Sequence, residues 1–443
     1  MNPEGILNSK VGNCFIVSSL RLRPVGLALR AKKISNEATS NLGIYNMDAM
    51  KRKKFAYVVV AMAAAGVTGA AQTKQVLAPP GLQISGIPFS PGVKAGDLYH
   101  IAGTMGTDSS GRIVAGGIEA QTKRVLENIG TILKAGGMNY KDVVSTNVYL
   151  RDMRDFDAMN KVYREVFKTN PPVRATTEAD LMLRGGLIEI SAIAARPDLE
   201  RRYINPQGWS TNPLPYSRGV AVGDHLFLAG LVSQNPQTGA PLNGDIKVQT
   251  KQILESAKTL AEAAGFKMSD IVWSRVWLTD PRDFQDMNDV YRTYFGEIPP
   301  TRATTRAALA STAYSVEIML WGVKGPKQRL GDPNPNLSQA IKVGNYVFLA
   351  GLTAGGSAQS LRGDIAGQTG AILTNIQSLI KTAGVDTPNA VTGQVWLTDS
   401  RNFSAMNEAY VRVFKSDPPA RATVGSQLMS ADNLVEIAVI AVK

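Results

Sequence analysis

The motif Pro-Pro-x-Arg-Ala-Thr occurs three times in this chain, at residues 171–176, 299–304 and 418–423. The copies lie more than a hundred residues apart, whereas the repeat units of solenoid proteins have only about 20–45 residues. A period of this length instead fits whole domains, which typically have about 50–200 residues. The motif therefore predicts a chain built from three similar domains in tandem.

The sequence around each motif repeats as well. A strand-like segment reads "LYHIAG", "HLFLAG" and "YVFLAG" in the three copies, and an apolar run with helical spacing follows each one. Further on, "VVSTNVYL" and its counterparts alternate as strands, and "RDFDAMNKVYREVF" and its counterparts have helical spacing. Apolar strands such as "LIEISAIAAR" follow the arginine motif. Each repeat thus predicts the order β-β-α-β-α-β-β.

This order predicts an α+β fold in which each domain has a mainly antiparallel or mixed sheet with two helices on one face. We expect the domains to span residues 76–199, 200–327 and 328–443. Three similar domains can bury their sheet edges or faces against one another, as the subunits of a cyclic homotrimer do. Short linkers favour this closed pseudo-threefold packing over three independent domains on a string.

The beginning of the chain differs from the rest. Residues 50–71 start with four basic residues, continue with an uncharged apolar run over 55–70, and end in small residues, which predicts a cleaved signal peptide. The alternatives are an uncleaved anchor, although a bilayer span needs about 20 apolar residues, or a buried strand. Residues 1–49 resemble neither a signal nor a domain, and we expect an untranslated upstream extension, with Met47 or Met50 as the real start. The protein is then expected to be exported, in the periplasm, or cytoplasmic if the signal interpretation is wrong.

Composition excludes several classes of chemistry. More than half of the net charge of +12 lies before residue 72, and no basic stripe with interleaved aromatics marks a nucleic-acid groove. The single cysteine, Cys14, precedes the predicted cleavage, so the body of the protein has no cysteine nucleophile or thiolate metal site. Its two histidines, His100 and His225, occupy different positions in their repeats, which favours a packing role over a zinc site or a catalytic triad.

Each repeat places an arginine and a glutamate in apolar surroundings. A glutamate follows each motif arginine at the same offset, inside an apolar strand: Glu189, Glu317 and Glu436 follow Arg174, Arg302 and Arg421. A buried acid must be paired, hydrogen-bonded or neutralised. One interpretation is a structural Arg–Glu bridge or a pair of charges at the rim of a domain interface. The other is a site in which arginine binds a carboxylate and glutamate holds or transfers a proton.

These motifs together resemble the RidA/YjgF family of enamine/imine deaminases, whose subunits are single domains that form homotrimers. The resemblance is carried by the "AG" turn, the "QT" helix, the "MN" helix, "PP.RAT" and the final "EI" strand of all three repeats. It implies chorismate-mutase-like domains packed as a single-chain pseudo-trimer, with a pocket at each interface between repeats. It also implies that the arginines bind the substrate carboxylate and that the glutamates position water.

Other family positions map onto this chain with some departures. The resemblance assigns a substrate-binding role to the pocket glycines and asparagines, at Gly103, Gly230, Gly351, Asn160, Asn288 and Asn407. The family's pocket tyrosine falls at Phe89, Tyr216 and Leu337, so the second repeat alone keeps it, and the pocket lined by Leu337 is expected to be weakened most. Its frequent cysteine is replaced by Thr176, Thr304 and Thr423, which is tolerable if this position acts through its backbone carbonyl.

The resemblance implies a hydrolase acting on C=N bonds, which converts 2-imino or enamine acids to 2-oxo acids and ammonia without a metal or cofactor. Orientation and proton transfer suffice for such a reaction, because the imines already hydrolyse in water. Two rival hypotheses stay open. One is a receptor for small carboxylic acids with little turnover, and the other is RNA cleavage, against which the weak charge of the body argues. The expected partner is a small carboxylic acid rather than a nucleic acid, and membrane contact would come only from an uncleaved signal.

Overall fold

The computed structural model describes residues 74–82 and 86–443 of the chain. The predicted extension, the predicted signal peptide and Cys14 lie outside the described residues. Within the described part of the chain, no helix combines the length and the apolar character that crossing a membrane requires.

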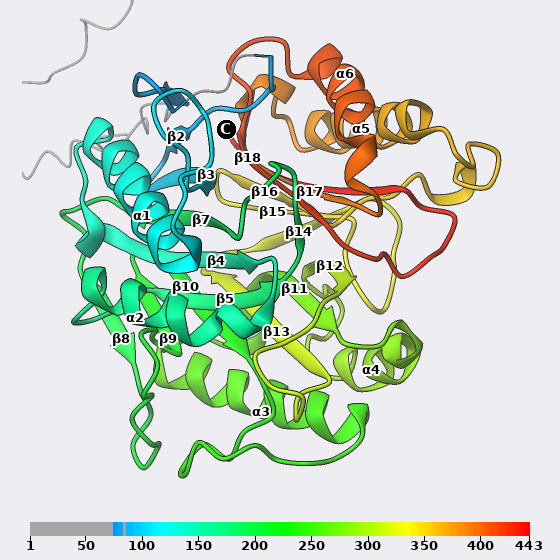
Figure 1. Cartoon of the computed structure of the whole chain (residues 1–443). Helices are drawn as coiled ribbons and strands as arrows, with labels where there is room; N and C mark the ends of the chain where they lie inside the picture. Colours follow the sequence, from blue (N-terminus) through cyan, green and yellow to red (C-terminus); the bar gives the residue numbers. More distant parts are fainter. Residues whose placement is uncertain (1–73, 83–85) are drawn as a thin grey trace, which may run out of the picture. The chain divides into compact units, whose positions relative to one another are not determined.

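The same series of elements occurs three times along the chain (Figure 1). The first repeat contains β1 (Gln75–Leu77), β2 (Gly92–Ala95), β3 (Leu98–Met105), α1 (Gly117–Ala135), β4 (Val143–Leu150), α2 (Phe156–Val166), β5 (Val173–Glu178), β6 (Asp180–Leu181) and β7 (Ile188–Ala195). The second contains β8 (Arg201–Ile204), β9 (Gly219–Val222), β10 (His225–Leu231), α3 (Ile246–Ala263), β11 (Ile271–Leu278), α4 (Phe284–Tyr291), β12 (Thr301–Arg306) and β13 (Val316–Val323). The third contains β14 (Lys327–Leu330), β15 (Ala340–Val343), β16 (Tyr346–Leu349), α5 (Ile365–Thr382), β17 (Ala390–Leu397), α6 (Phe403–Val413), β18 (Ala420–Gly425) and β19 (Val435–Val442).

The predicted order of elements is confirmed, with additional short strands. The segment "VVSTNVYL" forms β4 over its whole length, because its alternating β-branched and aromatic residues suit a pleated strand. Helix α1 ends at Ala135, where Gly136 caps it with its backbone N–H. The second predicted helix of this repeat begins later, because a single 3₁₀ turn precedes α2. The strands β1, β6, β8 and β14 carried no clear periodicity and were not predicted.

Each repeat contributes one mixed sheet. The strand orders are β1-β2-β3-β7-β4-β5, β8-β9-β10-β13-β11-β12 and β14-β15-β16-β19-β17-β18-β6. Each strand that carries the arginine motif pairs in parallel with the strand before it, as β5 does with β4, and the other pairs are antiparallel. A helix connects the two parallel strands in every repeat, as parallel pairing requires. Strand β6 of the first repeat completes the sheet of the third repeat by pairing with β18.

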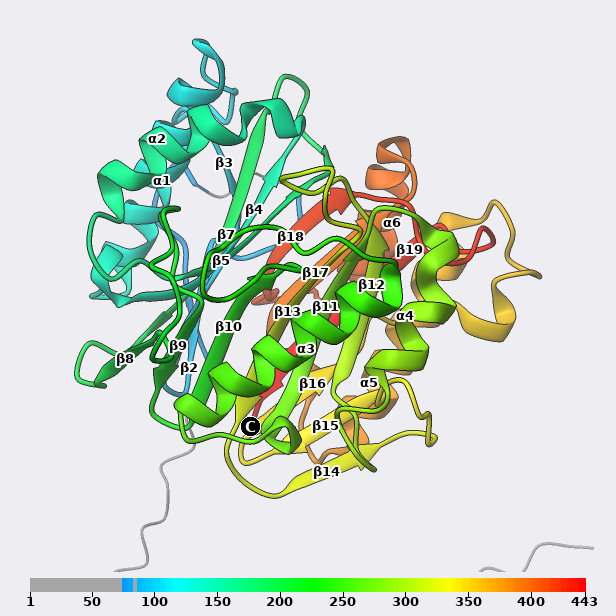
Figure 2. The same cartoon turned by 90° about the horizontal axis from the view of Figure 1, so that it is seen from below.

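The two helices of each repeat cover the same face of its sheet, as Figures 1 and 2 show. Apolar residues of α1 such as Val125, Leu126 and Ile129 pack there against strand residues such as Ile188 and Ile190. The equivalent cores of the second and third repeats are likewise formed by apolar residues of the helices and of the sheet. The prediction of two helices on one face is therefore confirmed.

The opposite faces of the three sheets share one interior. A single cluster of buried apolar residues joins Val93 and Ala175 of the first repeat, Phe227 and Trp321 of the second, and Phe348 of the third. Strand β5 packs against β10 and strand β18 packs against β3, so the first repeat has a neighbour on both sides. The repeats therefore form a closed pseudo-threefold body, and the alternative of independent domains on a string is wrong.

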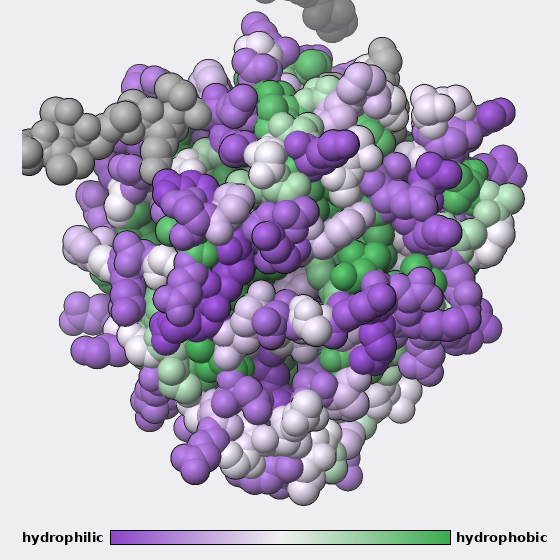
Figure 3. Space-filling model, turned by 90° about the vertical axis from the view of Figure 1, so that its left-hand side faces the viewer, coloured by the Kyte–Doolittle hydropathy of each residue, from purple (hydrophilic) through white to green (hydrophobic). Residues whose placement is uncertain are grey.

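The surface over the first and second repeats is mostly hydrophilic, with small and separate hydrophobic patches (Figure 3). Among the described residues, the large hydrophobic side chains that are clearly exposed are Val248, on α3, and Val411, on α6. Burial of the apolar faces of the sheets in the shared interior thus leaves the helices as the main solvent-facing layer.

Candidate active site

The motif arginines and the strand glutamates meet across the boundaries between repeats. Arg421 of the third repeat faces Glu189 of the first, and the same electrostatic relation joins Arg174 to Glu317 and Arg302 to Glu436. We name the three places the Glu189 site, the Glu317 site and the Glu436 site. In each one, a strand of one repeat brings the arginine beside the glutamate of the next, so the closed packing of the repeats creates the sites.

Every arginine of the three sites is buried and lies over an aromatic ring. The guanidinium carbon lies 4.9 Å from the ring centre of Tyr163 for Arg174, 4.7 Å from that of Tyr291 for Arg302, and 4.7 Å from that of Tyr410 for Arg421. Each tyrosine comes from the second helix of the same repeat, which places the negative face of its ring against the cation. The arginines are thus held in place without a carboxylate partner.

The predicted pocket asparagines also lie on these second helices. Asn407 accepts a hydrogen bond from Arg421 Nη2 at 2.7 Å, and this confines the guanidinium of the Glu189 site. Asn160 and Asn288 are buried as well, and each has a side-chain oxygen without a hydrogen-bond partner.

Polar atoms of the arginines and threonines remain unsatisfied in all three sites. They comprise Arg421 Nη1, both terminal nitrogens of Arg174, Arg302 Nε and Nη1, and the hydroxyl oxygens of Thr176, Thr304 and Thr423. Buried polar groups in proteins normally have a hydrogen-bond partner. Their gathering at the same place in three repeats indicates sites shaped to bind a polar ligand.

The three glutamates retain their protons to unusually high pH. Burial raises the pKa of Glu189, Glu317 and Glu436 from 4.5 to about 8, because an apolar environment disfavours the charged carboxylate. A backbone N–H of the neighbouring repeat, from Thr423 in the Glu189 site, donates to the carboxyl group and partly offsets this effect. The threonine position therefore faces the glutamate through its N–H, whereas the sequence analysis considered its carbonyl.

The interpretation of these residues as structural ion pairs is wrong. None of the three Arg–Glu pairs has a nitrogen and an oxygen within 4.0 Å, although both side chains are buried in every case. Deep burial also excludes charges at a solvated rim. The arginine and the glutamate of each site therefore face each other beyond ion-pair distance.

The predicted glycines allow the neighbouring strands to approach closely. A methyl group on Gly103 would lie 1.9 Å from Glu189 Oε1 and 2.9 Å from the Cβ of Ala422. Gly230 and Gly351 have the same surroundings in the other two sites, with Ala175 and Ala303 as the neighbouring alanines. Each of these alanines directly follows the arginine of the repeated motif. The motif therefore needs a small residue at this position, because the two repeats touch there.

Three serines that the sequence analysis did not single out complete the interfaces. Ser90 Oγ donates to the carbonyl oxygen of Pro418 at 2.6 Å, and Ser217 and Ser338 make the same bond to Pro171 and Pro299. Each serine directly follows Phe89, Tyr216 or Leu337, and its recurrence at one position of all three repeats could have identified it. The Pro-Pro corner of each motif is thereby attached to the next repeat.

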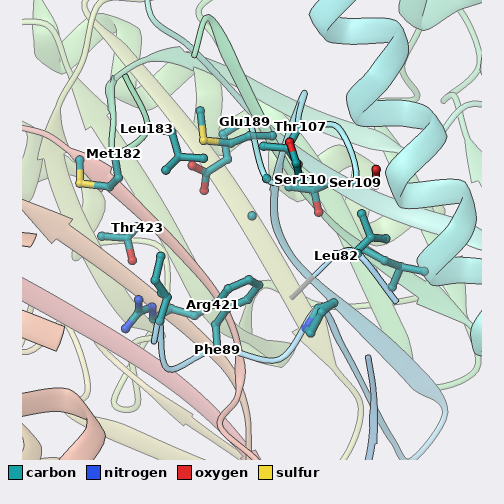
Figure 4. Close-up of a pocket in the computed structure, with 18 of the residues that line it drawn as sticks. Leu82, Phe89, Thr107, Ser109, Ser110, Met182, Leu183, Glu189, Arg421 and Thr423 are labelled. Carbon is teal, nitrogen blue, oxygen red and sulfur yellow. The ribbon is translucent and has the colours of Figure 1, made fainter. Parts of the chain in front are cut away.

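The Glu189 site opens into a cavity of about 240 Å³. Figure 4 shows Glu189 and Arg421 reaching this cavity from different sides, with Phe89 beside the arginine. Apolar side chains from the first repeat, including Met182 and Leu183, form part of its wall. Hydroxyl-bearing residues, which are Thr107, Ser109 and Ser110, line another part. The cavity therefore offers an anion-binding group, an acid and an apolar wall to one ligand.

The Glu317 site is more filled. Tyr314 occupies the position that Gly186 holds in the first repeat, and Gln234 Nε2 donates to its hydroxyl at 2.7 Å. A small cavity of about 30 Å³ lies beside Tyr216 and Gly230, and neither Arg174 nor Glu317 lines it. Tyr216 itself stacks on the arginine of this site, with 5.2 Å between the Arg174 guanidinium carbon and the ring centre.

The three positions of the family's pocket tyrosine thus differ in their surroundings. Leu337 packs against the helix-facing core of the third repeat, whereas Phe89 lines the 240 Å³ cavity. The 240 Å³ cavity therefore lies at a site without the tyrosine hydroxyl. The substitutions at the three positions had not indicated this.

Both histidines are buried within the interior shared by the repeats. His100 Nδ1 lies 2.8 Å from Thr392 Oγ1, and Trp321 Nε1 donates to His225 Nδ1 at 3.2 Å. No group of three or more His, Cys, Asp or Glu side chains that could hold a metal ion occurs in the described part of the chain. The packing interpretation of the histidines agrees with this placement.

Replacing Gly103 with alanine is expected to destabilise the protein by about 1–3 kcal/mol, because the added methyl group overpacks the contact with Glu189 and Ala422. Urea unfolding measures the change. The matched control is Gly370→Ala on α5, where no heavy atom lies within 4 Å of the added methyl group. That control should instead gain up to about 1 kcal/mol of helix stability. Equal stability of Gly103→Ala and the parent chain would contradict the close approach.

Comparison with known proteins places the chain in a family. The family model described as endoribonuclease L-PSP matches residues 83–196, 211–323 and 328–443. A RutC family protein of Pyrococcus horikoshii is 46% identical over 104 residues, which cover 24% of this chain and 82% of the relative. The human 2-iminobutanoate/2-iminopropanoate deaminase is 40% identical over 113 residues, covering 25% of this chain and 82% of its own.

Among solved structures, RidA from the Antarctic bacterium Psychrobacter sp. is similar at 31% identity, covering 27% of this chain and 98% of its own, with a TM-score of 0.26. The predicted fold class, three chorismate-mutase-like α+β domains packed as a single-chain pseudo-trimer, is confirmed by the family matches and the three mixed sheets. Because the matches to the family model cover well over half of the chain, the chain belongs to the RidA/YjgF family and carries three units of it in tandem.

Proposed function

We propose that this protein hydrolyses 2-imino acids, and their enamine tautomers, to 2-oxo acids and ammonia, and that the Glu189 site carries most of this activity. The observation that carries the proposal is the arrangement of Arg421 and Glu189. An arginine with an unpartnered nitrogen faces an acid that keeps its proton at neutral pH, and a cavity of about 240 Å³ opens between them. The human relative named as a 2-iminobutanoate/2-iminopropanoate deaminase supports the reaction class.

Arg421 binds the carboxylate of the substrate in this proposal. Its planar guanidinium can give two parallel hydrogen bonds to a carboxylate, and its contacts with Tyr410 and Asn407 fix its plane before the ligand arrives. Such preorganisation holds the neighbouring C=N carbon at a defined distance from Glu189. Proximity and orientation are then available to the reaction without a strong nucleophile.

Glu189 carries the proton through the reaction. The neutral acid first donates its proton to the imine nitrogen, and the resulting carboxylate removes a proton from the water that attacks the iminium carbon. The product is a carbinolamine with the proton back on Glu189. This proton then passes to the amine nitrogen, ammonia leaves as the C–N bond breaks, and the hydroxyl proton returns to Glu189 as the 2-oxo acid forms. A pKa of about 8 suits both directions of transfer near neutral pH.

The cavity offers more space than the smallest substrates need. One water molecule occupies about 30 Å³ in the liquid, so a cavity of about 240 Å³ has the volume of several waters beyond a three- or four-carbon acid. Apolar residues such as Met182 and Leu183 line it. We therefore expect 2-imino acids with longer apolar side chains to be substrates as well as 2-iminopropanoate and 2-iminobutanoate.

The test is the release of ammonia and 2-oxo acid from freshly generated imines, with protein beginning at Gln72. An amino-acid oxidase supplies a series of 2-imino acids from alanine to leucine and methionine. The expected result is faster hydrolysis than in buffer for the whole series. Rates equal to those in buffer at micromolar protein would contradict the proposed reaction.

The second candidate is a binding protein for small carboxylic acids with little turnover. The absence of the tyrosine hydroxyl at Phe89 favours it, because the site that opens into the 240 Å³ cavity lacks one of the family's polar groups. Binding of stable 2-oxo acids to a protein without deaminase activity would support this candidate. In either case, the predicted signal peptide leads us to propose that the protein acts outside the cytoplasm.

A further inference from the structure

A second cavity, of about 50 Å³, lies between the inner faces of the three sheets. Its lining includes Asn147 of β4, Arg275 of β11 and Gln394 of β17. These three residues hold equivalent positions, because each lies opposite the alanine of its own arginine motif in the parallel strand pair. The cavity therefore lies where the pseudo-threefold arrangement brings equivalent residues of all three repeats together, apart from the three glutamate sites.

Arg275 is a buried cation without an acidic partner. Its side chain is buried, with 6% relative exposure for the residue, and no carboxylate oxygen of the described residues lies within 4.0 Å of its nitrogens. Nη1 donates to the hydroxyl of Tyr149 at 2.9 Å, and this hydroxyl donates in turn to Gln394 Oε1 at 3.2 Å. Nε has no partner. The charge is thus met only by neutral groups.

Aromatic rings offset part of the cost of burying the charge of Arg275. The guanidinium carbon lies 4.9 Å from the ring centre of Trp273 and 5.2 Å from that of Trp396. Contacts of this kind contribute only about 0.5–2 kcal/mol, whereas burial of an unpaired charge costs several kcal/mol even after relaxation. Arginine cannot avoid this cost by losing its proton, because the guanidinium stays protonated in proteins. A bound anion would compensate the charge directly.

Other unpartnered polar groups line the same cavity. Asn147 Oδ1 and His100 Nε2 are buried without hydrogen-bond partners. When Thr392 donates its hydroxyl proton to His100 Nδ1 at 2.8 Å, Nε2 carries the ring proton and is a free donor. The two ends of an asparagine amide are assigned from their hydrogen bonds, so rotating the Asn147 amide presents its NH₂ group. Donors can therefore surround an anion beside Arg275.

We propose that this central cavity binds one small monovalent anion, a halide or a carboxylate of the size of formate, on the guanidinium of Arg275. The volume of about 50 Å³ exceeds the roughly 30 Å³ that a water occupies in the liquid and excludes larger acids. A homotrimer would place three copies of any arginine here, and their like charges would repel. A single chain can instead combine one arginine with the amides of Asn147 and Gln394, so the fusion of the repeats makes such a site feasible.

The test compares the stability of the protein in different sodium salts. Urea unfolding is measured in chloride, bromide and formate, with gluconate at equal ionic strength as the salt whose anion is too large. An anion that binds the folded state alone shifts the unfolding midpoint upward with its concentration. We expect this shift in the three small anions and not in gluconate, and the order of the small anions distinguishes halide from carboxylate.

Arg275→Gln is expected to remove the shift, whereas Arg282→Gln, which removes a charge from the surface, should keep it. Because the loss of a buried arginine can prevent folding, crystals of the unaltered protein grown in bromide provide a second measurement. Anomalous scattering should place a bromide within hydrogen-bond distance of the Arg275 guanidinium. Equal midpoints in all salts, a shift that survives in Arg275→Gln, or crystals without bromide at Arg275 would each overturn the proposal.

Discussion

Arg421→Ala is expected to lower kcat/KM for 2-imino acids by about 30- to 4,000-fold. Loss of one partner of a buried, hydrogen-bonded charge pair costs about 2–5 kcal/mol, and each 1.4 kcal/mol corresponds to tenfold. The substrate carboxylate would lose its cation, while Glu189 and the cavity would remain. Initial rates of ammonia release over a range of imine concentrations measure the effect.

Arg282→Ala is the control for Arg421→Ala, because it removes the same charge from an exposed position that pairs with Asp280. Lysine at position 421 should recover part of the activity, since it restores the charge without the planar fork. Alanine at Arg174 or Arg302 then measures the share of the other two sites, and we expect smaller losses there than for Arg421. An Arg421→Ala protein that is folded and fully active would remove the Glu189 site from the mechanism.

Glu189→Gln is expected to reduce kcat by about 10²–10⁴-fold, the range that general acid–base catalysis contributes. Glutamine keeps the size of the side chain but can neither give up nor take up a proton. Substrate binding through Arg421 should persist, so a stable 2-oxo acid should bind Glu189→Gln about as tightly as the parent protein. Loss of binding together with loss of kcat would show that Glu189 supports the structure of the site rather than the proton transfer.

The pH dependence of activity and of stability provides an independent test of the protonation of Glu189. Because the mechanism begins with protonated Glu189, activity should decline as the pH rises through about 8. Stability should follow the same direction, since a glutamate in the unfolded chain releases its proton near pH 4.5 and the folded protein keeps it to about pH 8. The stabilisation is thus complete below pH 4.5 and is lost as the pH rises to 8.

Urea unfolding at pH 5 and pH 9 measures this linkage in the parent protein and in Glu189→Gln. The parent should lose stability between the two pH values, and the variant should lose less, because one of the three buried acids no longer ionises. An equal loss in both proteins would indicate that Glu189 ionises in the folded state at its ordinary pKa.

The sequence alone determined the threefold repeat, the order of the main elements and the identity of the charged residues in the sites. Strand β4 and helix α1 follow from local periodicity and from the glycine after Ala135, which act within a few residues. The serines at positions 90, 217 and 338 recur at the same place in all three repeats, so the sequence contained a signal for their role that was overlooked. Domain bounds and the function of the first 73 residues remain predictions from sequence.

The tertiary structure decided which of these residues meet and how. Arg421 faces Glu189 from a different repeat, and a constant offset within each repeat contains no information about contacts between repeats. Glu189 and Arg421 line one cavity together, whereas neither Glu317 nor Arg174 lines the small cavity beside Tyr216, and the repeated motifs do not predict this difference. The buried charge of Arg275 likewise becomes evident only when three strands converge. Packing of distant segments, rather than local propensity, sets these features.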